Sequence, residues 1–143
     1  MPTPTAVVPT RRLPHLITWI ATLLLALPVF AAGLPKLLGQ GGWITAFAHW
    51  GYPGWLVPVV GTAEVLGVVL LFVPRFASVG ATMIAVIMAG AAVTHAAHGE
   101  TPRVAFTVAL CVLAVVVASV RRRSLRVPLL IGSRPRRTAG ASD

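Results

Sequence analysis

Charged residues are scarce in this chain. They make up 10% of its 143 residues, against a hydrophobic fraction of 57%, and only three of them are acidic. A soluble domain of this length needs far more charge to cover its surface. Between residues 14 and 120 only five charged residues occur: Lys36, Glu64, Arg75, Glu100 and Arg103. Because a charge in the hydrocarbon core of a bilayer is costly, this distribution indicates an integral membrane protein.

Cysteine is almost absent as well. The single cysteine, Cys111, lies in an apolar stretch, and no CxxC motif is present. A disulfide within the chain is therefore excluded, and thiol redox chemistry or a cysteine-rich metal site is not expected. The sequence also contains no phosphate-binding loop, nucleophile elbow or metalloprotease helix. We expect neither a bound metal nor a covalently attached cofactor.

The net charge of +9 comes from basic residues at the two ends of the chain. These residues flank apolar stretches and do not form a basic surface with interleaved aromatic residues, so nucleic-acid binding is excluded. In a membrane protein the same excess is typical of cytoplasmic flanks that face anionic lipid headgroups.

Four apolar segments are long enough to cross a bilayer. They cover approximately residues 14–34, 53–73, 76–97 and 102–120, each close to the ~20 residues that span a hydrocarbon core. The first resembles a signal peptide, but its length and the segments that follow predict a retained helix. The sequence therefore predicts an all-α integral membrane protein, a four-helix bundle in contact with the lipid bilayer.

The arginine residues predict the orientation of this bundle. They precede the first segment, lie in the short link between the second and third, and follow the fourth: Arg11, Arg12, Arg75, Arg121, Arg122 and Arg123. With four spans these positions share one side, which the positive-inside rule makes cytoplasmic. We expect an N-in/C-in, multi-pass protein of the bacterial inner membrane, with a cytoplasmic segment at 1–13. Residues 121–143 would form a basic, partly disordered cytoplasmic tail, in which 125–131 lies at the interface.

Glu64 is the strongest candidate for a functional residue. It lies eleven positions after Pro53, about 16 Å along a helix, and hence near the middle of the membrane. A carboxylate there either holds a proton or faces a partner inside the bundle. Two interpretations stay open: a structural glutamic acid bonded to a neighbouring helix, and a site for a ligand, a proton or an ion.

Lys36 ends the first apolar segment. Its long side chain can extend outward to the headgroups, or it can turn inward to a bound anion or to Glu64. The difference in depth between the two residues argues against a direct salt bridge, which we do not expect.

Two histidines end the third segment. His95 lies within the apolar span, and His98 follows in the turn before Glu100. Their spacing puts them on one side of a helix. They could share a metal with Glu100, but this pattern is weak, and an exposed position in the turn is expected for His98.

The link between the first two segments is aromatic. Residues 39–55 contain Trp43, Phe47, Trp50, Tyr52 and Trp55, as in an interfacial belt. Within it, 43–50 is compatible with a short amphipathic helix on the outer surface that roofs a pocket. Small residues such as Gly61, Gly67 and Ala81 predict close helix packing behind it.

Four pieces of the sequence resemble the DoxX family of small four-helix membrane proteins. They are AAGLPKLLG (31–39), WGYPGW (50–55), GTAEVLGVVLLFVPRFASVGA (61–81) and MAGAAVTHAAHGE (88–100). Their order and spacing cover most of residues 14–120. The family is named for a subunit of a thiosulfate:quinone oxidoreductase, and other members are linked with membrane redox complexes. The resemblance implies that Lys36, Glu64 and His95 occupy the family's polar positions.

The first hypothesis is thus a membrane subunit of a quinone-linked redox system. His95 would hydrogen-bond a quinone carbonyl, Glu64 would relay a proton, and Lys36 would stabilise an anionic substrate or semiquinone. Trp50, Tyr52, Gly61 and His98 would line the pocket near the outer leaflet. Electrons would come from a redox partner subunit or a substrate, and a homodimer is plausible.

Two alternatives come from other classes. A non-catalytic scaffold would recruit partners through the seven arginines between residues 121 and 137. A small carrier would use Glu64 as a proton or ion site.

Overall fold

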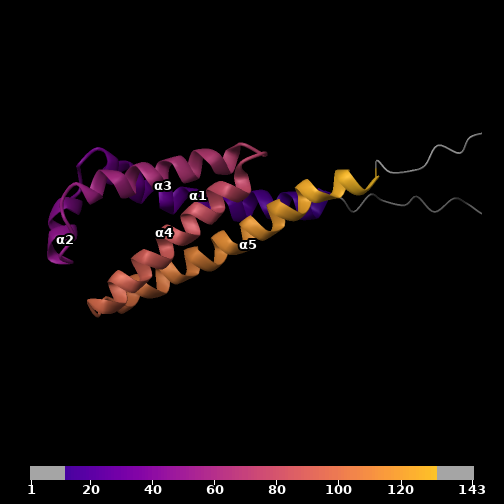
Figure 1. The fold of residues 1–143 in the computed structure, drawn as a ribbon. Coiled ribbons are helices and arrows are strands. Elements are labelled where there is room, and N and C mark those ends of the chain that lie inside the picture. Colours follow the sequence, from indigo (N-terminus) through magenta and orange to yellow (C-terminus); the bar gives the residue numbers. More distant parts are fainter. Residues whose placement is uncertain (1–11, 132–143) are drawn as a thin grey trace, which may run out of the picture.

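The computed structural model describes residues 12–131, and their side chains from 15 to 122, as an all-helical chain (Figure 1). The helices are α1 (Arg12–Leu37), α2 (Trp43–His49), α3 (Leu56–Phe72), α4 (Ala77–Ala97) and α5 (Thr101–Ile131). Four of them overlap the four apolar segments of the sequence. The cytoplasmic segment predicted at 1–13 falls almost wholly outside the described residues, as does the end of the tail from 132 onward.

The four long helices are arranged as two pairs. α1 packs along α3, and α4 packs along α5, while α3 and α4 join the pairs. In Figure 1 the pairs approach each other near the α3–α4 turn and diverge toward the end that carries α2. The apolar core fills the region where they meet, with Leu25, Leu71, Ile84, Ala114 and Val117 almost completely buried.

Close approach between α3 and α4 depends on glycine. A Cβ atom placed on Gly80 would lie 2.6 Å from the carbonyl oxygen of Gly67 and 2.8 Å from the Cβ of Leu70. Neither atom is the flexible end of a side chain, so no larger residue fits without moving a helix. The close packing predicted from the small residues is therefore present at this crossing.

Three helices are long and apolar enough to cross a membrane: His15–Leu37, Ala77–Ala97 and Thr101–Arg122. α3 is apolar too, but it is shorter, with 17 residues. Large apolar side chains cover the outward faces of all four, for example Leu27, Val69, Val93 and Val112. Such faces are stable against lipid and not against water, so the chain is a multi-pass membrane protein that contacts the bilayer.

The fifth helix continues past the predicted fourth span. α5 ends at Ile131, so the first eleven residues of the predicted tail extend it. Just past the predicted fourth span, the Arg121 guanidinium lies 5.1 Å from the centre of the Trp19 ring and donates a hydrogen bond to Thr22. Arg122 donates to Thr82 on α4. These contacts connect α5 at residues 121 and 122 to α1 and α4.

Candidate functional site: a cavity under the α2 segment

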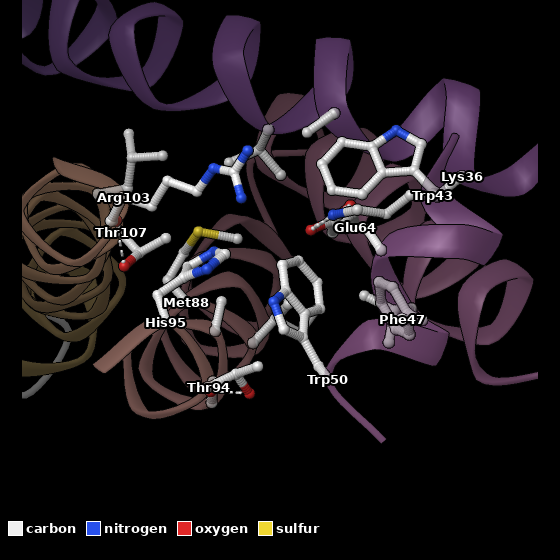
Figure 2. Close-up of a pocket in the computed structure, with 18 of the residues that line it drawn as sticks. Lys36, Trp43, Phe47, Trp50, Glu64, Met88, Thr94, His95, Arg103 and Thr107 are labelled. Carbon is white, nitrogen blue, oxygen red and sulfur yellow. Dashed lines mark hydrogen bonds and ion pairs between the residues drawn. The ribbon is translucent and has the colours of Figure 1, made fainter. Parts of the chain in front are cut away.

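A cavity of about 750 Å³ lies where the two helix pairs diverge (Figure 2). Its walls come from all five helices, and most are apolar or aromatic. The apolar and aromatic lining residues include Val29, Trp43, Phe47, Trp50, Met88, Phe106 and Leu110. Polar side chains enter at two places: Lys36 and Glu64 on one side, and Thr94, His95 and Arg103 on the other. A largely apolar cavity with few placed polar groups is typical of a site for a small organic ligand.

The first polar group is a buried ion pair. The Lys36 ammonium donates to both carboxylate oxygens of Glu64, at 2.7 and 2.8 Å, and these residues are 7% and 1% exposed. The same ammonium lies 4.5 Å from the centre of the Trp43 ring, which adds a cation–π contact. The pair therefore places a polar but charge-balanced group against the cavity.

Lys36 and Glu64 thus form the salt bridge that their difference in depth along the sequence disfavoured, and the register of α1 against α3 explains why. A Cβ atom on Gly61 would lie 2.5 Å from the backbone nitrogen of Leu37 and 2.8 Å from the Cβ of Lys36. The last turn of α1 thus packs beside the second turn of α3, and the first turn of α3 extends beyond it. Lys36 is consequently level with Gly61, and Glu64 is within its reach.

The second polar group is a cluster around Glu100 in the α4–α5 turn. His95 Nδ1 lies 2.6 Å from one carboxylate oxygen, and the other accepts hydrogen bonds from Arg103 at 2.9 Å and from the Trp50 indole at 3.3 Å. The Arg103 hydrogen bond has the largest effect on the pKa of Glu100 and, with the weaker ones from His95 and Trp50, lowers it to about 2 although desolvation opposes them. Glu100 is therefore ionised at neutral pH.

The α2 segment roofs the cavity, as the amphipathic pattern of 43–50 predicts. Trp43 and Phe47 of α2 line the cavity, and Trp50 and Tyr52 follow them. The roof is attached to α4 through side chains: the Tyr52 hydroxyl is 2.9 Å from the Thr94 hydroxyl, and the Trp50 and His95 rings meet edge to face at 5.0 Å. Four of the five aromatic residues of this link thus form a wall of the cavity.

The predicted site residues fall into two groups. Lys36, Trp50, Tyr52, Glu64 and His95 all line the cavity. Gly61 and His98 are not among its lining residues. Gly61 packs against α1 instead, and His98 is exposed, with its Nδ1 2.8 Å from the Thr94 carbonyl oxygen and its ring beside His49. Of the residues with described side chains, no three of His, Cys, Asp or Glu are grouped as metal ligands.

Three further residues contribute to the site through contacts that the sequence did not predict. Trp43 covers the Lys36 ammonium, Glu100 holds His95, and Arg103 bonds Glu100 and lines the cavity. Each had a signal in the sequence: Glu100 and Arg103 are two of the five charged residues between 14 and 120, and Trp43 lies in the segment 43–50 that is compatible with a roof. The positions of Trp43 and Arg103 depend on how α2 and α5 meet the other helices.

The fold and the cavity together define a polytopic helical membrane protein with a ligand-sized site at one end of its bundle. Within that class, residues 20–117 match the DoxX-like family, and the chain belongs to this family. No curated protein and no solved structure matches the chain.

Proposed function

We propose that the protein binds a quinone in the cavity under α2 and serves as the membrane subunit of a quinone-linked redox system. The observation that carries this proposal is the cavity itself. Its volume of about 750 Å³ falls in the range of sites for small organic ligands. Its aromatic walls suit a planar ring, and its two polar groups lie on different sides, as the two oxygens of a quinone require.

The lining residues also provide a route of entry from lipid. Val86 and Phe106 line the cavity and are 68% and 57% exposed on the outward faces of α4 and α5. A ligand that partitions into the bilayer can therefore reach the cavity between helices. A quinone would supply reversible exchange between carbonyl and hydroxyl groups, while this chain provides binding, orientation and hydrogen bonds.

The proposal includes the membrane arrangement. α3, with its flanking turns, is the fourth span, so that the chain is N-in/C-in and the cavity lies toward the outer leaflet of a bacterial inner membrane. Electrons would come from a partner subunit or a substrate, and a homodimer is compatible with the narrow bundle.

The two alternatives have less support. In a carrier Glu64 must bind and release an ion or a proton, yet both of its oxygens accept bonds from Lys36. A scaffold would act through the basic tail, whose end lies outside the described residues. The scaffold alternative also gives the cavity no role, whereas a carrier would use it, since Glu64 lines it.

The test is ligand binding to the purified protein in detergent. A quinone analogue with a short alkyl tail should raise the melting temperature and quench tryptophan fluorescence. At a ligand concentration about 100 times Kd, the stabilisation should be about 2.7 kcal/mol. Trp43 and Trp50 line the cavity, so Trp43→Phe and Trp50→Phe should each remove part of the quenching.

Trp55 provides the matched control, since it is 66% exposed and does not line the cavity. Trp55→Phe should leave the ligand-dependent part of the quenching unchanged. If saturating analogue shifts neither the melting temperature nor the fluorescence of the unmodified protein, the quinone site is refuted.

A further inference from the structure

The contact between His95 and Glu100 determines which nitrogen of the imidazole carries its proton. An ionised carboxylate only accepts hydrogen bonds. Glu100 also receives bonds from Arg103 and Trp50, both of which are donors, and these keep it ionised. The nitrogen of His95 that lies 2.6 Å from Glu100 is Nδ1, so Nδ1 must carry the hydrogen.

In a neutral imidazole the other nitrogen is then a bare acceptor. His95 lines the cavity, and none of the residues with described side chains donates a hydrogen bond to its Nε2. The edge-to-face contact with the Trp50 ring, at 5.0 Å and 84°, holds the plane of the imidazole. The site therefore offers a ligand a fixed hydrogen-bond acceptor at this point.

We infer that the ligand presents a hydroxyl group to His95, so that the cavity selects a hydroquinone or another phenol over the corresponding quinone, with Glu100 as the positioning residue. This inference rests on the proposed function and deepens it. It reverses the direction of the hydrogen bond expected from the sequence, in which His95 donates to a quinone carbonyl. A carbonyl placed against Nε2 would leave two acceptors facing each other, at a cost in affinity.

Glu100→Gln tests this inference directly, because the neighbours of the side chain determine the orientation of the new amide. Arg103 and Trp50 donate to Oε1, so the amide oxygen of the glutamine should take that place. Its NH₂ group would then face His95 Nδ1 and donate to it. That hydrogen bond moves the proton of the imidazole to Nε2, which becomes a donor suited to a carbonyl. The variant should thus abolish the preference of the site, because a hydroxyl oxygen accepts from Nε2 as a carbonyl oxygen does.

The experiment compares three probes that differ only in their ring oxygens. They are a decyl-substituted benzohydroquinone kept reduced under argon, the matching benzoquinone, and the dimethyl ether of the hydroquinone. Affinities are measured by the quenching assay on the full-length protein in detergent. The hydroquinone should bind on the order of tenfold more tightly than either other probe. In Glu100→Gln this preference should be lost, and the quinone and the hydroquinone should bind with similar affinity.

His49→Gln is the matched control, since His49 is exposed, lies in the same roof and does not line the cavity. It should keep the preference for hydroquinone. Equal affinity for the three probes in the unmodified protein, or tighter binding of the quinone, overturns the inference while the proposed function stands. Failure of every probe to bind overturns the proposed function and the inference with it.

A second readout needs no ligand. ¹⁵N NMR of histidine-labelled protein distinguishes the two tautomers, and the His95 resonances are assigned by their loss in His95→Gln. The protonated nitrogen should be Nδ1 in the unmodified protein and Nε2 in Glu100→Gln. A proton on Nε2 in the unmodified protein refutes the inference, whatever the affinities are.

Discussion

The Lys36–Glu64 pair shows how much a buried charge depends on its partner. Each group alone would be an uncompensated charge among apolar side chains, and the loss of one partner of a buried pair is strongly destabilising. The geometry here is favourable, since one ammonium bonds both carboxylate oxygens and lies against an aromatic ring. The pair therefore stabilises the α1–α3 contact only while both members are present.

We expect Lys36→Met to lower the free energy of unfolding by about 3–5 kcal/mol, because it leaves Glu64 without a partner. Glu64→Gln, which strands the ammonium, should have an effect of similar size. The double variant Lys36→Met/Glu64→Gln removes both charges and should recover most of the loss. The measurement is a double-mutant cycle of thermal or chemical unfolding in detergent. Additive effects, with the double variant the least stable of all, would show that the pair does not interact.

At the level of residues, the sequence identified polar members of the site but did not predict the contacts between them. Lys36, Glu64 and His95 stand out because ionisable groups are rare in apolar segments. The depth of a residue along its own helix, however, does not show how a neighbouring helix is shifted along that helix. For that reason the ion pair was not expected. The bond between His95 and Glu100 was missed because it depends on the shape of a turn.

At the scale of elements, the positions of the helices could be predicted because apolar length and proline or glycine breaks are local properties. The end of α5 could not be read from apolar length, since the helix continues through the basic residues 121–123. The sequence pattern also did not predict which helices pack together. It depends on glycine contacts such as Gly61 against α1, which are visible only once two helices are placed together.

We expect Gly61→Ala to separate α1 from α3. Its Cβ would lie 2.5 Å from one backbone atom of α1 and 2.8 Å from another, the carbonyl oxygen of Gly33. Backbone atoms within a helix cannot rotate away, so the helices must shift, at a typical cost of about 1–3 kcal/mol. The shift also stretches the Lys36–Glu64 bonds. Thermal unfolding should show a lower melting temperature.

Gly90→Ala is the control for this substitution. Gly90 is also within a helix, but a Cβ atom there has no neighbour within 4 Å. Because alanine favours helix more than glycine does, this variant should match or exceed the stability of the unmodified protein. Equal melting temperatures for Gly61→Ala and the unmodified protein would contradict the close α1–α3 contact.

At the scale of the whole molecule, the ion pairs increase the difference in net charge between its two ends. At the α2 end both cations are balanced, Lys36 by Glu64 and Arg103 by Glu100. At the other end Arg75, Arg121 and Arg122 face no carboxylate among the residues whose side chains are described. The end with the α3–α4 turn therefore has the excess positive charge that the positive-inside rule assigns to the cytoplasm.

This asymmetry predicts the sidedness of three turns, which single cysteines can report in a Cys111→Ala background. Gly54→Cys precedes α3, Pro74→Cys lies between α3 and α4, and Thr101→Cys begins α5; all three positions are exposed. In intact spheroplasts a membrane-impermeant maleimide should label Gly54→Cys and Thr101→Cys, and Pro74→Cys only after permeabilisation. The reverse pattern would contradict the N-in/C-in orientation. Labelling of Gly54→Cys and Pro74→Cys from the same side would mean that α3, the shortest of the four long helices, does not cross the membrane.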